Sequence, residues 1–319
     1  MLPPLSTQAN RIVNRATGLP VLLRGINRSG LEYSEPREQG FLTAAGISHS
    51  EIALLAGDWR CNIIRLPFNQ EFALRGRGRW KGEDYLNAID QVVEWAAGAG
   101  MYTLLALQWL QSDVPHAPER DFVPPLPNLE TPHLWSTLAR RYRDRPEVLF
   151  DLLTEPHDPV EGDPWPLYAA GGRILTKRKG VTQAEWPLWA TRLIDEIRVE
   201  HPRALIFVSG AEWGYNLEGI DCGRPDVVYS THVYPGKKKS WNRAFAEKAR
   251  SMPVFLGEFG GTAGHTRWGM KLLSLAGELQ LGWCAWGWPD QPRLIENAQP
   301  TVFGDLVRNA LLLSNQAQF

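Results

Sequence analysis

Eight short apolar segments alternate with amphipathic, helix-like segments along almost the whole chain, and this alternation constrains the fold more than any other feature. Segments such as CNIIRLPF and MYTLLALQW are apolar throughout rather than at every second residue, which is typical of parallel strands buried on both faces. Between the apolar segments, the spacing of apolar residues follows the helical period of 3.6. The expected strands are 20–27, 61–68, 101–109, 148–153, 204–209, 226–234, 253–259 and 282–288, and the expected helices are 48–59, 82–100, 131–146, 182–202, 240–250, 266–280 and 301–316.

Eight strands, each but the fifth followed by a helix, predict an α/β protein with a (β/α)8 barrel that forms a single domain over residues 1–319. A doubly wound open sheet is the competitor, but the sequence lacks the glycine-rich phosphate-binding turn of that fold. An Ala-Thr-Gly turn signal also predicts an N-terminal hairpin at about residues 10–24, ahead of the barrel.

Charge and cysteine usage exclude several classes of function. The formal net charge is −1, and no basic run is longer than the KKK at 237–239. Nucleic-acid binding needs a clustered positive field. The three cysteines lie far apart without metal-binding spacing, so neither a disulfide scaffold nor a zinc site is expected. No signal peptide or membrane-spanning run is predicted. We expect a soluble monomer, secreted only if a signal sequence has been removed.

Two glutamates stand at strand ends, where a barrel of this kind carries its chemistry. Glu155 closes the fourth strand in LLTEPHD, and Glu258 closes the seventh in FLGEFGG. Glycoside hydrolysis requires such a facing pair, since one carboxyl group must be protonated to assist the leaving oxygen and the other ionised to attack the anomeric carbon. Each glutamate could instead pair with an arginine. The presence of Arg65, His232 and Tyr234 at other strand ends favours catalysis.

The motifs RGIN, IIRLPF, LLTEPHD, THVYPG, LGEFGG and GWCAWGW, in this order, resemble the strand-end motifs of glycoside hydrolase family 5, a cellulase family. The resemblance spans nearly the whole chain and implies catalytic glutamates on strands four and seven of a barrel. By this resemblance, Glu155 is the general acid/base and Glu258 is the nucleophile of a retaining double displacement. Arg65 and the Tyr234 hydroxyl are expected to lower the pKa of Glu258. The charge of Glu258 is expected to raise the pKa of Glu155.

Further site residues follow from the same resemblance. His232 is expected to hydrogen-bond the acid/base or a sugar hydroxyl. Trp286 is expected to form the platform beneath the sugar at the cleavage point, although GWCAWGW has three tryptophans and only some can face the cleft. Tyr33, Trp109, Trp213, Trp288 and Trp165 lie in strand-end loops and could form flanking subsites, or could equally belong to the core. The loops 110–130 and 158–181 are long and are expected to shape the cleft.

Two positions depart from the family pattern. Thr154 stands where an asparagine usually precedes the acid/base, and Gln108 stands where the third strand often ends in histidine. A glutamine amide can still bond a sugar hydroxyl. The usual asparagine bonds the sugar 2-hydroxyl, a contact that strengthens in the transition state, and threonine has a shorter reach. The site could tolerate threonine at a slower rate, recognise a sugar with another C2 configuration such as mannose, or bind without hydrolysis. The threonine could also be an introduced substitution.

The sequence therefore predicts a hydrolase that acts on a β-linked polysaccharide or oligosaccharide. The favoured activity is that of a retaining endo-β-1,4-glycosidase, an endoglucanase that degrades cellulose-like glucan. A β-mannanase, another β-glycanase of the same family or a weakly active carbohydrate-binding pseudoenzyme are the alternatives. No metal or cofactor is predicted, because the two-carboxylate mechanism needs none.

Overall fold

The barrel strands form a closed parallel sheet in the computed structural model, which describes residues 2–110, 124–160 and 166–314. Neighbouring strands pair in parallel all the way round the wall. The predicted (β/α)8 fold is confirmed, and each barrel strand overlaps the segment expected for it. In chain order the barrel strands are β3 (Arg24–Asn27), β4 (Ile63–Asn69), β7 (Tyr102–Trp109), β8 (Val148–Asp151), β9 (Ile206–Ser209), β10 (Val227–Val233), β11 (Val254–Phe259) and β12 (Gly282–Ala285).

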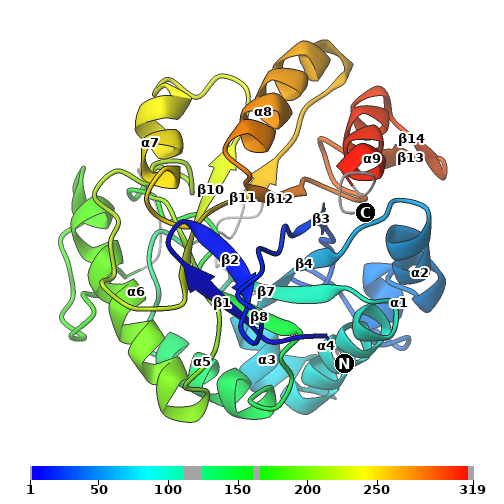
Figure 1. Cartoon of the computed structure of the whole chain (residues 1–319). Coiled ribbons are helices and arrows are strands. Elements are labelled where there is room, and N and C mark those ends of the chain that lie inside the picture. The colour runs from blue at the N-terminus through cyan, green and yellow to red at the C-terminus, as the bar shows by residue number, and fades with distance from the viewer. Residues whose placement is uncertain (1, 111–123, 161–165, 315–319) are drawn as a thin grey trace.

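Helices surround the strands on the outside (Figure 1). They are α1 (Phe41–Ala45), α2 (His49–Gly57), α3 (Gln70–Arg75), α4 (Gly82–Gly98), α5 (Thr131–Arg141), α6 (Val181–Glu200), α7 (Glu247–Ala249), α8 (Thr266–Glu278) and α9 (Val302–Ser314). The segment expected to be a helix at 240–250 begins as a π-helical turn, Asn242–Ala246, that continues into α7. Residues 210–226 contain no helix, as the sequence predicts for the connection after the fifth strand. Among the described helices, none is both long and apolar enough to cross a membrane.

The N-terminal hairpin lies closer to the N-terminus than predicted. Its strands are β1 (Leu5–Gln8) and β2 (Arg11–Asn14), so only its second strand falls within the predicted segment 10–24. The Ala-Thr-Gly turn does form, and beyond it the chain pairs with β2 through the Val13–Pro20 bridge. Asn14 N donates to Leu19 O and Val21 N donates to Ile12 O, both at 2.9 Å. Burial explains the difference, because Leu5 and Ile12 are 3% and 8% exposed and pack with apolar side chains of the barrel interior. The hairpin thereby covers the amino-terminal end of the barrel.

The barrel interior changes from apolar to charged along its axis. The interior nearest the amino-terminal end of the barrel is filled by an apolar cluster of Leu5, Ile12, Leu23, Ile63, Tyr102, Leu104, Leu149, Leu205, Phe207, Val228, Phe255 and Cys284. Arg65 and Asp151 come two residues after Ile63 and Leu149 on the same strands, and both are fully buried. Since side chains two residues apart point to the same face of a strand, these charges form the next layer towards the carboxyl ends. Charged groups thus lie directly beneath the predicted site.

Short antiparallel ribbons and loops complete the chain. The ribbons are β5 (Gly76–Arg77) with β6 (Trp80–Lys81) and β13 (Ile295–Glu296) with β14 (Gln299–Pro300). Neither these ribbons nor α1 and α3 are predicted from the sequence, because each is too short to show a recognisable period. Parts of the two long loops, at 111–123 and 161–165, lie outside the described residues, and so does Trp165.

Candidate active site

Two glutamates face each other at the carboxyl ends of the barrel strands. Glu155 follows β8, and Glu258 lies in β11 one residue before the strand ends. The ring of His232, from β10, lies between them, with Nδ1 3.0 Å from Glu155 Oε1 and 3.5 Å from Glu258 Oε2. One oxygen of each carboxylate and this nitrogen all lie within 4.8 Å of one another. The fold therefore brings together the two carboxyl groups that the sequence singles out.

Glu258 is the more deeply buried of the pair, with 5% of its side chain exposed against 18% for Glu155. Arg65 Nη1 donates to its Oε1 at 2.8 Å, and the Tyr234 hydroxyl donates to its Oε2 at 2.9 Å. Burial nevertheless raises the pKa of Glu258, because it outweighs the neighbouring groups that favour the charged form, Arg65 and Tyr234 among them. The expected lowering of this pKa is wrong in direction, although both predicted partners are in place.

His232 is an uncharged member of the site. Burial lowers its pKa to about 4, so the imidazole is neutral at neutral pH. Two carboxylates, which can only accept hydrogen bonds, face Nδ1, so the proton of the neutral ring is placed on this nitrogen. Nδ1 then donates to Glu155. Gly257 makes room for the ring, since a Cβ there would lie 3.0 Å from His232 Nε2 and 2.2 Å from Ser230 Oγ. His232 is therefore held as a fixed hydrogen-bond donor beside Glu155.

Arg65 is the charged centre of the buried layer, and acceptors surround its guanidinium. Nη1 donates to Asn27 Oδ1 at 2.7 Å as well as to Glu258. Nε donates to Asp151 Oδ2 at 2.9 Å, and Nη2 lies 2.9 Å from the same oxygen. Nη2 also donates to Thr154 Oγ1 at 3.2 Å. Four of the five N–H groups of the guanidinium thus donate hydrogen bonds within the network, and these contacts fix the plane of the side chain.

Thr154 belongs to this buried network rather than to the open cleft. Its side chain is fully buried, and Oγ1 donates to Leu107 O at 2.9 Å while accepting from Arg65 Nη2 at 3.2 Å. Both interactions are internal to the protein. The hydroxyl that replaces the usual asparagine amide therefore stabilises the arginine and the third barrel strand, and its hydrogen is not available to a sugar.

Gln108 and Trp286 stand at the ends of the third and eighth strands, where the sequence places them. Gln108 is 8% exposed, and its buried Oε1 has no hydrogen-bond partner among the described residues. An unpaired buried carbonyl oxygen is costly, so this atom is suited to accept a hydroxyl from a ligand. Trp286 follows β12, is half-buried, and donates from Nε1 to Gln291 O at 3.1 Å. One side chain offers an acceptor and the other an apolar face.

Three of the proposed subsite aromatics lie at the surface of this end of the barrel. Tyr33 is 39% exposed, lies 6.0 Å from the ring of the half-buried Trp109, and donates to Asp290 Oδ2 at 2.6 Å. Trp213 is 38% exposed and stacks on His157, with ring centroids 3.5 Å apart and planes 9° from parallel. Trp213 also borders a cavity of about 640 Å³ beside the start of α6.

Trp288 does not belong with these aromatics. It is 2% exposed, packs edge-on against Trp59 at 5.0 Å, and donates from Nε1 to Glu51 Oε2 at 2.9 Å. The prediction that Trp288 could form a subsite is therefore wrong, and the core interpretation holds. The reason is local, because the chain turns after Ala285, where β12 ends, and carries Trp288 back between α2 and the barrel.

Two buried residues of the network, Asp151 and Asn27, lie in predicted strands but are not among the site residues predicted from the sequence. An acid inside an otherwise apolar, doubly buried strand is itself a signal, since such a charge needs a partner. Asn27 donates from Nδ2 to Gly257 O at 2.9 Å and accepts from Arg65, which links β3 to β11 next to Glu258.

Glu155, His232 and Glu258 also have a spacing at which their donor atoms could hold a metal ion. Arg65 already supplies positive charge to Glu258 from 2.8 Å, which disfavours a second cation at that carboxylate. The hydrogen bonds among these groups are the arrangement expected for acid/base and nucleophilic chemistry on a bound substrate.

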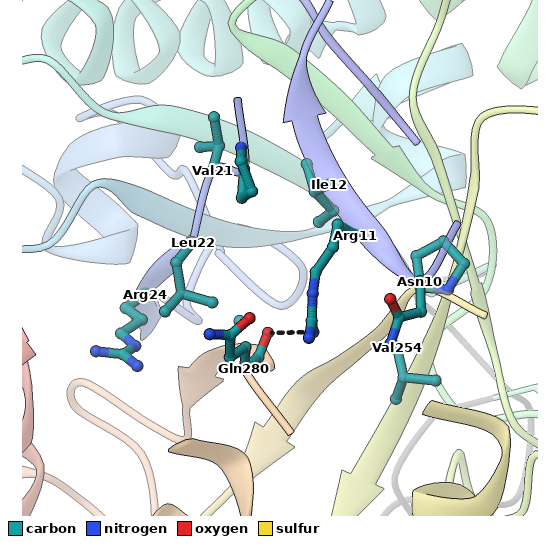
Figure 2. Close-up of a pocket in the computed structure, with 11 residues that line it drawn as sticks. Asn10, Arg11, Ile12, Val21, Leu22, Arg24, Val254 and Gln280 are labelled. Atoms are coloured by element: carbon teal, nitrogen blue, oxygen red, sulfur yellow. Dashed lines mark hydrogen bonds between the residues drawn. The ribbon is translucent and has the colours of Figure 1, made fainter. Parts of the chain in front are cut away.

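A second cavity, of about 350 Å³, lies at the opposite end of the barrel (Figure 2). Arg24, Val254 and Gly282, the first residues of β3, β11 and β12, line it. Arg11 crosses it from the hairpin and donates to Leu279 O at 2.7 Å, at the end of α8. The carboxylate pair lies at the carboxyl ends of the strands, so this cavity is separate from the candidate active site.

A parallel (β/α)8 barrel with facing glutamates on its fourth and seventh strands has the architecture of a barrel glycoside hydrolase. The family model for Cellulase (glycosyl hydrolase family 5) matches residues 16–291. The chain therefore belongs to glycosyl hydrolase family 5, as the strand-end motifs imply.

Relatives and solved structures agree with this assignment. Endoglucanase E-5 of Thermobifida fusca is 22% identical over 86% of this chain and 54% of its own length. Endoglucanase A of Butyrivibrio fibrisolvens is 22% identical over 80% of this chain and 52% of its own length. The chain thus spans about half the length of these curated relatives.

Among solved structures, a β-glucanase from Saccharophagus degradans is 22% identical, covers 98% of this chain and 94% of its own, and superimposes with a TM-score of 0.78. The catalytic domain of a Thermobifida fusca endoglucanase is 19% identical, covers 97% of both chains and has a TM-score of 0.72. Structures of both proteins have been solved in complex with cellotetraose. At these identities the likeness shows the shared barrel fold.

Proposed function

We propose that this protein is a retaining endo-β-1,4-glucanase in which Glu155 is the general acid/base and Glu258 the nucleophile. The observation that carries the proposal is the carboxylate pair, whose nearest oxygens lie within 4.8 Å of each other and share His232 between them. Retaining glycosidases hold their carboxyl groups about 5–5.5 Å apart, whereas inverting enzymes need about 6.5–9.5 Å to fit a water molecule. The short separation supports double displacement.

In the first step, Glu258 attacks the anomeric carbon while Glu155 donates its proton to the glycosidic oxygen. The bond from that carbon to the leaving oxygen breaks, and an ester forms between the sugar and Glu258. Arg65 and Tyr234 hold the attacking carboxylate through one hydrogen bond to each of its oxygens. They fix its direction, so little reorganisation is needed on reaching the transition state.

In the second step, Glu155 has lost its proton and acts as a base. It takes a proton from a water molecule whose oxygen attacks the anomeric carbon, and the ester to Glu258 breaks. The product keeps its original configuration, and Glu155 is protonated again. The hydrogen bond from His232 Nδ1 stabilises Glu155 in its ionised form between the two steps.

Substrate binding is assigned to the surrounding residues. Gln108 Oε1 is proposed to accept a sugar hydroxyl, and the face of Trp286 to carry the sugar at the cleavage point. Tyr33, Trp109 and Trp213 are proposed to extend the cleft on its two sides. A β-1,4-glucan is favoured as substrate because the relatives are named endoglucanases and two structural neighbours bind cellotetraose.

β-Mannanase activity is the second candidate, and Thr154 is the observation that favours it. The Thr154 hydroxyl is occupied by Arg65 and Leu107, so this position makes no donor contact that would select the equatorial 2-hydroxyl of glucose. A site without that contact is expected to discriminate less between sugars that differ at C2.

The proposal is tested by measuring reducing ends released from carboxymethyl-cellulose, mixed-linkage β-glucan, glucomannan, galactomannan and xylan, with the Glu258→Gln variant as the blank. We expect release from the glucans by the wild-type protein only. Faster release from galactomannan would assign the mannanase activity instead. Binding of cello-oligosaccharides without release from any polymer would identify a binding protein and refute the enzymatic assignment.

A further inference from the structure

Asp151 is a buried acid that the steps above do not use. It lies in β8, four residues before Glu155, and its side chain is fully buried. Its Oδ2 accepts from Arg65 Nε at 2.9 Å and lies 2.9 Å from Nη2, while Ser209 Oγ donates to Oδ1 at 3.4 Å. A fully buried carboxylate is costly unless it is paired, and burial raises the pKa of Asp151. Arg65 is the partner that opposes this rise and favours the ionised form.

Arg65 thus divides one positive charge between two buried carboxylates. The edge formed by Nε and Nη2 faces Asp151, and Nη1 faces Glu258 at 2.8 Å. The division has two consequences. The Asp151 contact fixes the guanidinium plane, so only one N–H points at Glu258. It also draws part of the positive charge away, which leaves Glu258 more basic than an exclusive ion pair would.

We propose that Asp151 is a positioning residue for the nucleophile: through Arg65 it sets both the direction and the basicity of the Glu258 carboxylate. The inference rests on the proposed role of Glu258. A carboxylate neutralised by its own arginine would be a poor nucleophile, whereas one left unsupported would be free to turn. Sharing the arginine between two acids provides the support and keeps the nucleophile reactive.

The charged and titratable groups around this pair come from several strands. Those that face Asp151 or Glu258 are Arg65 from β4, Glu155 after β8, His232 from β10, Tyr234 and Lys237 after β10, and Cys284 from β12. His232 is neutral at neutral pH, and burial raises the pKa of the Cys284 thiol well above neutrality. Arg65 is therefore the charge through which Asp151 acts in the working range of pH.

The test compares the wild type with Asp151→Asn, which keeps an oxygen acceptor for Arg65 but removes the charge. The matched control is Asp90→Asn, because Asp90 also pairs with an arginine, Arg141 at 2.6 Å, but on the outer helices. Titration of the Glu258 side-chain carboxyl is followed by ¹³C NMR, with Glu258→Gln used to assign the signal. In parallel, kcat and KM are measured against pH on a soluble aryl β-cellobioside.

In Asp151→Asn we expect the Glu258 carboxyl to titrate about one pH unit lower than in the wild type, because a nearby negative charge has gone. The acidic limb of kcat/KM should move with it, and kcat should fall about tenfold with KM within about twofold. Asp90→Asn should change neither. An unchanged Glu258 titration in a folded Asp151→Asn protein overturns the inference.

The NMR titration also separates this inference from the proposed function, since it needs no turnover. If the wild type hydrolyses no glycoside but Asp151→Asn still shifts the titration of Glu258, the proposed function is refuted and the coupling between the two carboxylates stands. Should Asp151→Asn fail to fold, the wild type still decides. Asp151 must stay ionised while Glu258 takes up its proton, and protonation of Asp151 before Glu258 overturns the inference.

Discussion

Replacing Thr154 by valine removes one hydroxyl from the buried network without changing the shape of the side chain. The hydroxyl accepts from Arg65 Nη2 at 3.2 Å and donates to Leu107 O at 2.9 Å, and the site is fully buried. Loss of a hydrogen bond to a charged group costs about 1.5–3 kcal/mol. Leu107 O keeps a partner, because it also accepts from the backbone N–H of residue 154 at 2.9 Å. We therefore expect the variant to lose about 2–3 kcal/mol of unfolding free energy.

The corresponding shift in melting temperature follows from the size of the chain. With an unfolding entropy of about 2.1 cal/mol/K per residue, the melting temperature of a chain of 319 residues falls by about 3–4.5 °C for that change in free energy. Thr103→Val is the matched control, because Thr103 is also a fully buried strand residue but its Oγ1 has no partner among the described residues. Its loss should leave the melting temperature unchanged or higher. Equal melting temperatures for the two variants, measured by calorimetry, would refute the role assigned to Thr154.

Two further predictions concern pH and the aromatic residues. Glu258 must be ionised to attack, and burial raises its pKa. The rate of hydrolysis of an aryl β-cellobioside should therefore begin to fall on the acidic side at a pH above the pKa of an ordinary glutamate, about 4.3. An acidic limb at or below that value would contradict the burial argument. Trp213→Ala should raise KM for cello-oligosaccharides several-fold and leave the melting temperature nearly unchanged. Trp288→Ala should lower the free energy of unfolding by about 3–5 kcal/mol. The reverse pattern, measured by kinetics and calorimetry, would show that the two tryptophans are misassigned.

The sequence predicts the barrel well because a parallel, doubly buried strand leaves a clear signal. The apolar runs ending at Glu155 and Glu258 fix the ends of two strands, and the fold then determines that these ends meet. The hairpin begins earlier than predicted because its first strand depends on burial of Leu5 and Ile12 against the barrel, which local turn signals do not report. Trp288 is misassigned for a similar reason, since one turn after β12 decides which way it faces.

The limits of prediction are sharpest for the groups that act through another side chain. The direction of the Glu258 pKa shift depends on how far burial outweighs Arg65, and a sequence gives the partner but not the burial. Thr154 reads as a lost sugar contact until its hydroxyl is seen between Arg65 and Leu107. Asp151 has a sequence signal, an acid in an apolar strand, but its partner is known only once β4 and β8 are placed.

The most direct test of the central claim is rescue by azide of the two glutamate variants on an aryl β-cellobioside with a good leaving group. In Glu258→Ala, azide takes the place of the nucleophile and attacks the anomeric carbon from the face opposite the leaving group, so we predict α-cellobiosyl azide. In Glu155→Ala, azide attacks the glycosyl-enzyme, so we predict β-cellobiosyl azide. The anomers are distinguished by ¹H NMR. The same anomer from both variants, or exchanged anomers, would contradict the roles assigned to Glu155 and Glu258.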